Sequence, residues 1–247
     1  MLKKAVGYLP GSRRLANAYY GFLNTINTFR FRNVLKRGSR EEIFTYYYRE
    51  NGWNNPESAS GWGSTLEYTE NIRKEIPIVM ERFNIHSILD APCGDYNWFR
   101  FVNRGDDAFY LGGDIVPDLI QKNKERYQNQ NTSFIQLDII AEDLPNAELW
   151  LCRDALFHFS NADIFAALNN FIKSDINYLF TTTHTECRAN ADILTGQFRL
   201  LNLELPPFNF PPPIQYVDDW IADFPVRKIG LWERKTIKDL LSGEGAD

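Results

Sequence analysis

Hydrophobic and polar positions follow two alternating patterns after residue 86. Short apolar runs end at an Asp or Gly, and between them lie segments whose apolar residues recur every three or four positions. Short apolar runs bounded by turn residues are typical of buried strands, and the longer spacing is typical of amphipathic helices. The predicted strands are Ser87–Ala91, Ala108–Gly113, Ser133–Leu137, Glu148–Cys152, Tyr178–Thr183 and Ile229–Arg234.

Two helices are predicted between these strands. Pro117 opens the helix Asp118–Tyr127, and Ser160 is the predicted N-cap of the helix Asn161–Ile172. Alternation of strands and helices predicts a parallel sheet with helices on both faces. In such sheets ligands bind at the carboxyl ends of the strands, so we expect the functional residues there.

An uncharged amphipathic stretch between residues 15 and 29 precedes this pattern, and basic residues flank it on both sides. The favoured interpretation is a helix that packs on the domain, so we assign residues 1–60 to a basic N-terminal helical cap. A basic amphipathic helix could instead lie on an anionic membrane surface or dock a partner. An acid-free N-terminus that bears arginines also fits an organelle targeting segment.

The composition is that of an ordinary globular protein. The 247 residues are 44% hydrophobic and 24% charged, which excludes a largely disordered or fibrous chain. No apolar run reaches the roughly 18 residues of a membrane-spanning helix. The three cysteines form no CxxC pair, and so sparse and odd a set argues against a secreted disulfide framework. We therefore expect a cytoplasmic protein.

The charge is distributed unevenly along the chain. Residues 1–40 contain nine Lys or Arg and no acid, whereas residues 41–247 hold the other 18 bases and all 32 acids, a net charge of −14. Non-specific binding to nucleic acid needs clustered basic side chains. The acidic body therefore disfavours nucleic acid as the main partner.

Three predicted strands end at an acidic residue: Asp90, followed closely by Gly94, then Asp114 and Asp138. A glycine just past a strand lets the backbone approach a ligand, and an acid at the end of the second strand can accept hydrogen bonds from ribose hydroxyls. Asp138 suits an acceptor for an adenine amino group. Any one of these acids could be an ordinary turn residue, but three at consecutive strand ends predict a nucleoside cofactor.

A dinucleotide and S-adenosylmethionine are the two cofactors to compare. The dinucleotide fingerprint uses three glycines and backbone N–H groups to hold a pyrophosphate. Here Pro92 has no N–H to offer, and Gly94 is the one glycine of the three that is present. The sequence therefore favours S-adenosylmethionine.

The same segments resemble the motifs of the class I S-adenosylmethionine-dependent methyltransferases. LDAPCGD at residues 89–95 is similar to their glycine-rich first motif, GGD at 112–114 to the second, LD at 137–138 to the third and CRDALFH at 152–158 to the fourth. Pro92 and Tyr96 stand where most members have glycine. The resemblance implies an α/β, doubly wound, Rossmann-like fold with a seven-stranded, mostly parallel sheet, in which Ile229–Arg234 belongs to an antiparallel edge hairpin.

The resemblance further implies S-adenosyl-L-methionine as the cofactor of a methyltransferase domain at residues 61–241, with a disordered tail at 242–247. The residues that it places against the cofactor are Trp62, Ser64, Asp90, Ala91, Cys93, Gly94, Asp95, Trp98, Asp114, Ile115, Leu137, Asp138, Ile139, Arg153 and Asp154. The segments WNNPESASGWGS, TTTH and GLWER resemble a bacterial subgroup that modifies surface polysaccharides. This implies methyl transfer to an oxygen of a sugar or phosphoramidate group on a capsular polysaccharide precursor.

A hydroxyl acceptor benefits from a general base, typically His, Asp or Glu. Among residues where the fourth and fifth strands end, His184 is the favoured base and Asp154 the next, while His158 could be a base or a hydrogen-bonded structural residue. His184, Glu186 and Cys187 could ligate a divalent cation, but their spacing matches no strong motif. No metal is therefore predicted.

Two further segments have candidate roles. The small-residue stretch 58–65 around Trp62 is expected to be a lid over the cofactor rather than a simple linker. The proline-rich stretch 206–213 is stiff and is expected to form a wall of the acceptor pocket. The apolar faces of this wall would come from Leu203, Phe208, Phe210 and Tyr216.

Two rival functions remain open. One is a non-catalytic scaffold that binds S-adenosylmethionine or another nucleoside and docks a glycosyltransferase or a membrane through the basic N-terminus. The other is a nucleic-acid methyltransferase, which is disfavoured because the fourth strand ends in CRDA rather than an NPPY-type sequence and because the body is acidic. The expected partner is thus a small-molecule or saccharide acceptor, and the sequence does not determine the oligomeric state.

Overall fold

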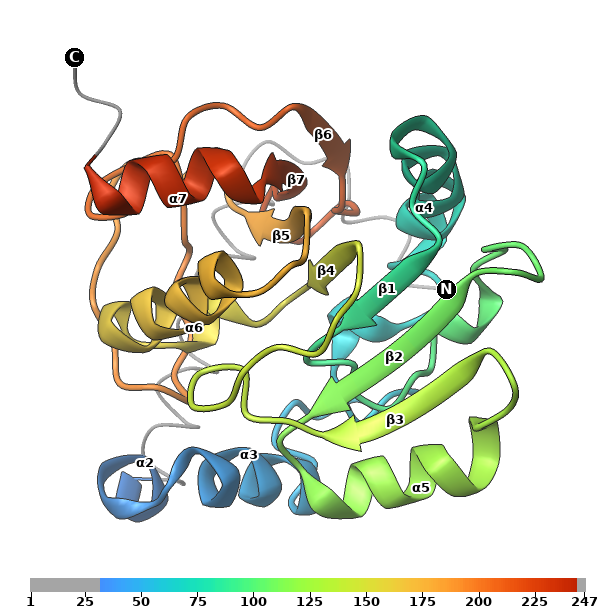
Figure 1. Cartoon of the computed structure of the whole chain (residues 1–247). Helices are drawn as coiled ribbons and strands as arrows, with labels where there is room; N and C mark the ends of the chain where they lie inside the picture. The colour runs from blue at the N-terminus through green and yellow to red at the C-terminus, as the bar shows by residue number, and fades with distance from the viewer. Residues whose placement is uncertain (1–31, 244–247) are drawn as a thin grey trace.

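The computed structural model describes residues 32–243 and shows a seven-stranded sheet between two layers of helices (Figure 1). The strands lie in the order β3-β2-β1-β4-β5-β7-β6. β1 to β5 pair in parallel, and β7 is antiparallel to both β5 and β6. Their bounds are β1 Ser87–Asp90, β2 Phe109–Asp114, β3 Thr132–Gln136, β4 Leu149–Cys152, β5 Tyr178–Thr183, β6 Gln215–Asp218 and β7 Lys228–Glu233.

Helices cover both faces of the sheet because successive strand residues point to opposite sides. On one face Leu89 and Trp150 pack with α6 and α7, and on the other Ile88 and Leu151 pack with α4 and α5. The α-helices are α2 Arg32–Arg37, α3 Arg40–Arg49, α4 Glu70–Phe83, α5 Pro117–Tyr127, α6 Asn161–Lys173 and α7 Arg234–Ser242. Three short 3₁₀ helices are η1 Trp62–Ser64, η2 Phe99–Phe101 and η3 Leu156–His158.

Each strand and helix predicted after residue 86 is present, with both ends within one residue of the prediction. Ser160 is the N-cap of α6, as predicted: its hydroxyl accepts the N–H of Asp163 at 3.1 Å. The predicted elements did not include α4, β6 or α7. β6 has only four residues, and α4 contains Pro77, a residue that usually marks the end of a helix. β7 belongs to an antiparallel edge hairpin as predicted, with β6 as its outer strand.

The amphipathic stretch 15–29 lies outside the described residues, as do residues 244–247. Ser242, predicted to begin a disordered tail, is instead the last residue of α7, because Ile237 anchors that helix in the core with no exposed surface. Within the described part of the chain, no helix combines the length and apolarity needed to cross a membrane.

The described part of the predicted cap consists of α2 and α3. A capping box starts α3: the Ser39 hydroxyl accepts the N–H of Glu42, and the Glu42 carboxylate accepts the N–H of Ser39. α3 lies beside α5 near the carboxyl ends of β2 and β3 (Figure 1), where Arg49 forms an ion pair of 2.8 Å with Asp118. One face of α3 thereby covers the edge of the sheet where ligands of this fold class bind.

Candidate active site

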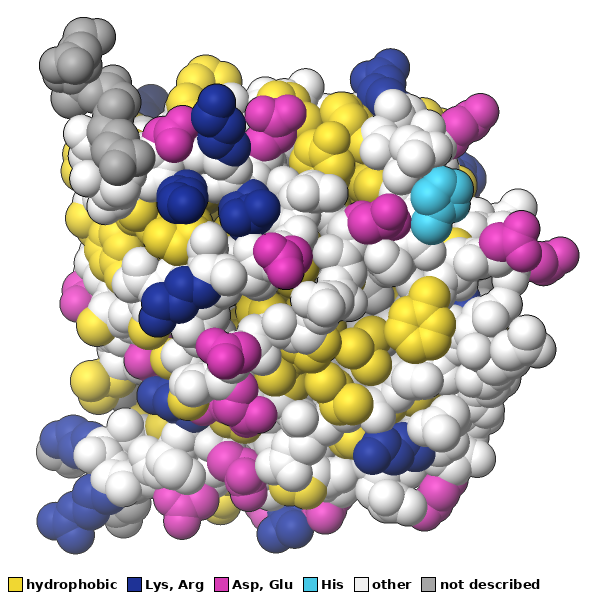
Figure 2. Space-filling view, viewed as in Figure 1, with side chains coloured by type: hydrophobic (Ala, Val, Ile, Leu, Met, Phe, Trp, Pro, Cys, Tyr) yellow, Lys and Arg dark blue, Asp and Glu magenta, His cyan; other side chains and the backbone are white. Residues whose placement is uncertain are grey.

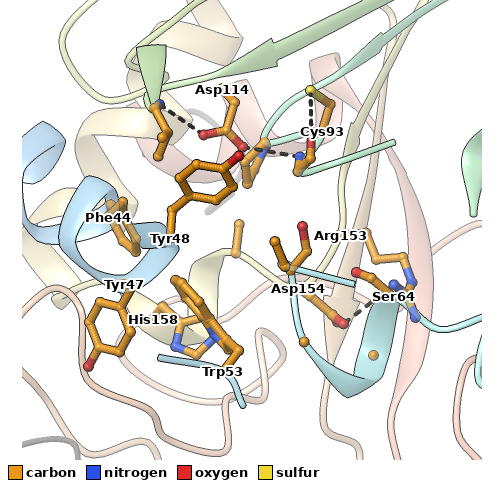
Figure 3. Close-up of a pocket in the computed structure, with 18 of the residues that line it drawn as sticks. Phe44, Tyr47, Tyr48, Trp53, Ser64, Cys93, Asp114, Arg153, Asp154 and His158 are labelled. Carbon is orange, nitrogen blue, oxygen red and sulfur yellow. Dashed lines mark hydrogen bonds and ion pairs between the residues drawn. The ribbon is translucent and has the colours of Figure 1, made fainter. Parts of the chain in front are cut away.

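A cavity of about 620 Å³ lies at the carboxyl ends of β1, β2 and β4, under α3. Its volume is in the range of sites for small molecules and cofactors. Figure 3 shows Phe44, Trp53 and His158 on one side of this pocket and Arg153 and Asp154 on the other. All the residues that the sequence placed against the cofactor line the cavity, except Ala91 and Asp95.

The loop after β1 brings main chain to the cavity wall. Gly94 has a φ of 55°, a left-handed conformation that glycine adopts at little cost. A Cβ at this position would lie 2.1 Å from Oγ of Ser60. The Gly94 N–H donates to Oδ2 of Asp114 at 3.1 Å, so the first two predicted motifs are in direct contact.

Asp114 is a buried carboxylate with two backbone donors. Besides the Gly94 N–H, the N–H of Val116 donates to its Oδ1 at 3.0 Å. Burial raises the pKa of Asp114 to about 6, although these backbone donors oppose the rise. Each carboxylate oxygen has a further lone pair, so Asp114 can accept hydrogen bonds from a ligand in the cavity.

Asp90, at the end of β1, has an exposed fraction of only 2%. The Tyr110 hydroxyl donates to its Oδ2 at 2.7 Å. Burial raises the pKa of Asp90 to about 7, against the opposing effects of this hydrogen bond and of the nearby Arg153 charge. Asp90 therefore changes between its protonated and ionised forms near neutral pH.

Asp138 already has partners on both carboxylate oxygens. Arg40 of α3 donates to Oδ2 at 2.9 Å, and the N–H of Ile140 donates to Oδ1 at 2.9 Å. The predicted adenine acceptor is thus also the residue that holds the start of α3 over the sheet. Leu137 and Ile139, on either side of it, give the cavity apolar walls. Arg40 was not predicted as a site residue, although it lies at the start of an amphipathic helix.

Two predicted cofactor residues have other roles. Ala91 is fully buried, and its carbonyl accepts the indole N–H of Trp150 at 2.8 Å. Asp95 holds the segment that begins at Ser58: its carboxylate accepts the Ser58 hydroxyl at 3.0 Å and the Ala59 N–H at 2.8 Å. Neither residue lines the cavity, so both shape its wall from behind, and their direct contact with the cofactor stays a prediction.

The predicted lid segment does lie against the glycine loop and the end of β4. Trp62 and Ser64 line the cavity. A Cβ on Gly63 would lie 2.3 Å from Oδ2 of Asp154, so the main chain of this segment passes directly over that carboxylate. That the segment 58–65 closes over a bound cofactor stays a prediction.

A compact group of charges lies at this end of the cavity. Arg153 donates to both carboxylate oxygens of Asp219, at 3.0 and 2.9 Å. Arg227 Nη2 lies 2.8 Å from Oδ2 of Asp154, and its Nε donates to the Asp219 carbonyl at 2.8 Å. Arg153, Asp219 and Arg227 are nearly inaccessible to solvent. Asp219 and Arg227 were not predicted as site residues, because no local motif in the sequence marks them.

Asp154 is held as a carboxylate by this group. Burial would raise its pKa, but the positive charges of Arg153 and Arg227 outweigh burial and lower the pKa below its ordinary value. A carboxylate stabilised in this way is a poor proton acceptor. Asp154 can instead stabilise positive charge that develops nearby.

His158 lines the cavity and has a defined tautomer. Its Nδ1 lies 2.9 Å from the carbonyl oxygen of Gln197, and because a carbonyl only accepts, Nδ1 must carry the hydrogen. Among residues 32–243, none forms a hydrogen bond with Nε2. Burial lowers the pKa of His158 below its ordinary value, so the ring is neutral at pH 7 and Nε2 is an acceptor.

His184, the favoured base in the sequence analysis, does not line the cavity. Only 2% of it is exposed, and its Nδ1 accepts the N–H of Leu201 at 3.3 Å. Burial lowers the pKa of His184 to about 3. The structure therefore corrects the order of the candidates: His158, not His184, can reach a ligand. The reason is that β5 ends beneath segment 198–203 rather than at the cavity.

The predicted proline-rich wall is also wrong. Leu203, Phe208 and Phe210 have at most 3% of their surface exposed and belong to the core cluster beneath α6 and α7. Tyr216 does not line the cavity; its hydroxyl donates to the Glu204 carboxylate. The stretch packs inward because its aromatic residues fill the space between α6 and β7. In its place, α3 and the turn around Trp53 form the wall.

No cluster of three or more His, Cys, Asp or Glu side chains in the described part of the chain is arranged as a metal site would be.

The comparisons with known proteins bear on the fold. No family model and no curated protein matches the sequence. Among solved structures, magnesium protoporphyrin IX methyltransferase from Synechocystis PCC 6803 with bound SAM is 13% identical, with a TM-score of 0.54 over 78% of this chain and 96% of its own. The mitomycin 7-O-methyltransferase MmcR is 12% identical, with a TM-score of 0.58 over 94% and 76%. PigF with SAH is 10% identical, with a TM-score of 0.58 over 88% and 69%.

These likenesses, together with the strand order and the antiparallel β7, show that the chain has the class I S-adenosylmethionine-dependent methyltransferase fold.

Proposed function

We propose that the protein is an S-adenosylmethionine-dependent methyltransferase that acts on an oxygen of a small acceptor. The observation that carries this proposal is that one continuous cavity is lined both by Asp114, at the end of β2, and by His158, a neutral histidine with an available Nε2. A nucleoside site and a proton acceptor in one enclosed space are what methyl transfer to a hydroxyl requires.

The residues at the β2 end fit S-adenosylmethionine. Asp114 supplies acceptors for ribose hydroxyls, and Ile115, Leu137 and Ile139 supply apolar walls for a purine. Asp90 supplies a carboxylate for an ammonium group. When bound, this cofactor would supply a methyl group on a positively charged sulfur, a leaving group that would become a neutral thioether as the methyl group passed to the acceptor oxygen.

The residues at the other end handle the proton. In the proposed reaction Nε2 of His158 accepts the hydroxyl proton as the oxygen bonds to the methyl carbon. The Gln197 carbonyl keeps the ring in the tautomer that this transfer needs. Asp154 stays ionised beside its arginines, and its negative charge acts to raise the pKa of His158 against a smaller opposing effect of Arg227, which favours the imidazolium that forms. The segment 59–64 helps to exclude water from the cavity.

The rival functions receive less support. A binding scaffold has no need of a neutral histidine in the wall of its cavity. For a nucleic-acid substrate, the view in Figure 2 shows basic side chains interspersed with acidic ones rather than gathered into a basic surface. The sugar or phosphoramidate acceptor and docking through the basic N-terminus stay predictions from the sequence.

The test is a calorimetric titration of S-adenosylmethionine and S-adenosylhomocysteine into the wild-type protein and two variants. Asp114→Asn should weaken both affinities strongly, because it removes the charge and one acceptor oxygen from the cavity. Asp107→Asn is the matched control, since this acid is exposed before β2 and does not line the cavity. Failure of the folded wild-type protein to bind either compound would overturn the proposal. Binding without methyl transfer to any hydroxyl compound would favour the scaffold.

A further inference from the structure

Five aromatic side chains form a continuous group at one end of the cavity, which we call the aromatic chamber: Tyr47, Trp53, Phe157, His158 and Phe198. Their ring centroids lie 4.6 Å apart for Tyr47–Trp53, 6.1 Å for Trp53–His158, 4.6 Å for Phe157–His158 and 5.4 Å for Phe157–Phe198. All five line the cavity. Figure 3 shows Tyr47, Trp53 and His158 on the side of the pocket away from Asp114.

We propose that the aromatic chamber binds a flat, uncharged aromatic acceptor that carries a hydroxyl group, with this hydroxyl directed at Nε2 of His158. This inference rests on the proposed methyltransferase function and names its substrate class. Aromatic rings prefer offset or edge-to-face contacts with other rings at centroid distances of about 4.5–7 Å. A chamber whose walls are rings presents such contacts to a planar ligand on several sides.

The low polarity of the aromatic chamber favours an acceptor with one hydroxyl group over an acceptor with several. Every hydroxyl group buried without a partner costs about 1–3 kcal/mol, and a saccharide carries several. Three of the five rings that form the chamber belong to phenylalanine or tryptophan, which offer no acceptor. His158 supplies a ring acceptor at Nε2, and burial keeps it neutral. Burial also raises the pKa of Tyr47, so that side chain brings no charge either.

Trp53 is held in place by its backbone before any ligand binds. It lies between Asn51 and Asn54, which have left-handed φ values of 47° and 50°. The Asn54 N–H donates to the Asn51 carbonyl at 2.8 Å, and the Gly52 N–H donates to the Tyr47 carbonyl at 2.7 Å. A rigid aromatic wall loses little entropy on binding, which favours a rigid, planar partner.

The test uses 1-naphthol as the probe. The protein is first saturated with S-adenosylhomocysteine, with that binding measured by calorimetry, and 1-naphthol is then titrated in. We expect saturable binding of 1-naphthol to the wild type, and Trp53→Ala should weaken it by at least roughly tenfold. Trp53→Phe should largely restore it. Neither substitution should change the affinity for S-adenosylhomocysteine. Naphthalene, which lacks the hydroxyl, should bind more weakly than 1-naphthol to the wild type, and this difference should vanish in His158→Ala.

Two controls distinguish failure of the aromatic acceptor from failure of the proposed methyltransferase function. Phe101→Ala removes an aromatic ring that is 50% exposed and outside the cavity, and it should leave 1-naphthol binding unchanged. Methyl α-D-glucopyranoside, tested in the same way, should not bind. Binding of S-adenosylhomocysteine without binding of 1-naphthol, or binding of the glucoside in its place, would overturn the aromatic acceptor alone. Loss of S-adenosylhomocysteine binding in the wild type would instead overturn the proposed function.

Discussion

The Nδ1 atom of His158 lies 2.9 Å from the backbone carbonyl of Gln197, 39 residues further along the chain. Since the carbonyl can only accept, this contact fixes the hydrogen on Nδ1 and leaves Nε2 as a proton acceptor in the cavity wall. The contact also joins η3 to the segment 196–199, so the base and part of the aromatic chamber are positioned together.

We predict that His158→Asn lowers kcat by about 10²–10⁴-fold with any hydroxyl acceptor that turns over, because the general base is lost. The affinity for S-adenosylhomocysteine should not change. Because the pKa of His158 lies below its ordinary value, kcat of the wild type at saturating cofactor should be flat above about pH 6.5 and fall only below it.

His184→Asn distinguishes the two histidines. This residue does not line the cavity, so we expect a loss of thermal stability with kcat per folded molecule largely retained. The exposed His86→Asn should change neither quantity. A large loss of kcat in folded His184→Asn, with His158→Asn still active, would reverse the assignment.

The buried Asp90 predicts a pH-dependent stability. Its pKa rises to about 7 on folding, so the native state binds a proton that the unfolded state releases between about pH 4 and 7. The resulting stabilisation is present in acid and is lost as the pH rises through 7. Asp90→Asn removes the cost of the buried charge, so the ligand-free variant should be more stable than the wild type at pH 8, by up to about 4 kcal/mol.

Thermal unfolding at pH 4.5 and pH 8 checks this sign. The advantage of Asp90→Asn should shrink at pH 4.5, where the native wild-type carboxyl is already neutral, and cofactor affinity should fall in the variant at pH 8. The half-exposed Asp118→Asn should change stability by no more than about 0.5 kcal/mol at either pH. An advantage that grew in acid would contradict the prediction.

Two glycines with positive φ separate backbone strain from close approach. Gly105→Ala places a Cβ in open space at a φ of 78°, so it should cost about 1–2 kcal/mol of stability without altering cofactor affinity. Gly94→Ala adds the same strain and also brings a Cβ to 2.1 Å from Ser60 Oγ. It should therefore displace the segment 58–64 and weaken S-adenosylhomocysteine binding measured by calorimetry. Equal effects of the two substitutions on binding would show that the loop tolerates the side chain.

The neighbouring residues Asp218 and Asp219 test how much the buried Arg153–Asp219 ion pair contributes to stability. Asp219 has no exposed side-chain surface and accepts two hydrogen bonds from Arg153, so Asp219→Ala leaves a buried guanidinium without its main partner. Breaking such a pair typically costs 3–5 kcal/mol, which denaturant unfolding should detect. Asp218→Ala is the matched control because its side chain is 63% exposed and pairs with Lys228 at 3.4 Å. It should cost less than about 1 kcal/mol.

The sequence by itself determined the elements around the sheet and most of the cofactor end of the cavity. Strand and helix periodicity is local, so the strands and α-helices between residues 87 and 183, though not the two short 3₁₀ helices, could be predicted to within one residue. Asp90, Gly94 and Asp114 could be found because turn chemistry at a strand end shows in a few consecutive residues. A parallel sheet then brings its strand ends together, whatever the side chains of its helices are.

Only the tertiary structure decided the other end. Whether His158 or His184 faces the cavity depends on how segment 196–203 packs across the sheet, and no local pattern encodes that. The ion pair of Arg40 with Asp138 likewise joins residues that are far apart in the chain. Phe208 packs in the core rather than in a pocket wall because of contacts with residues distant in sequence. The acceptor end depends on such distant contacts, because packing rather than a shared strand edge brings together its three segments, 47–53, 157–158 and 196–199.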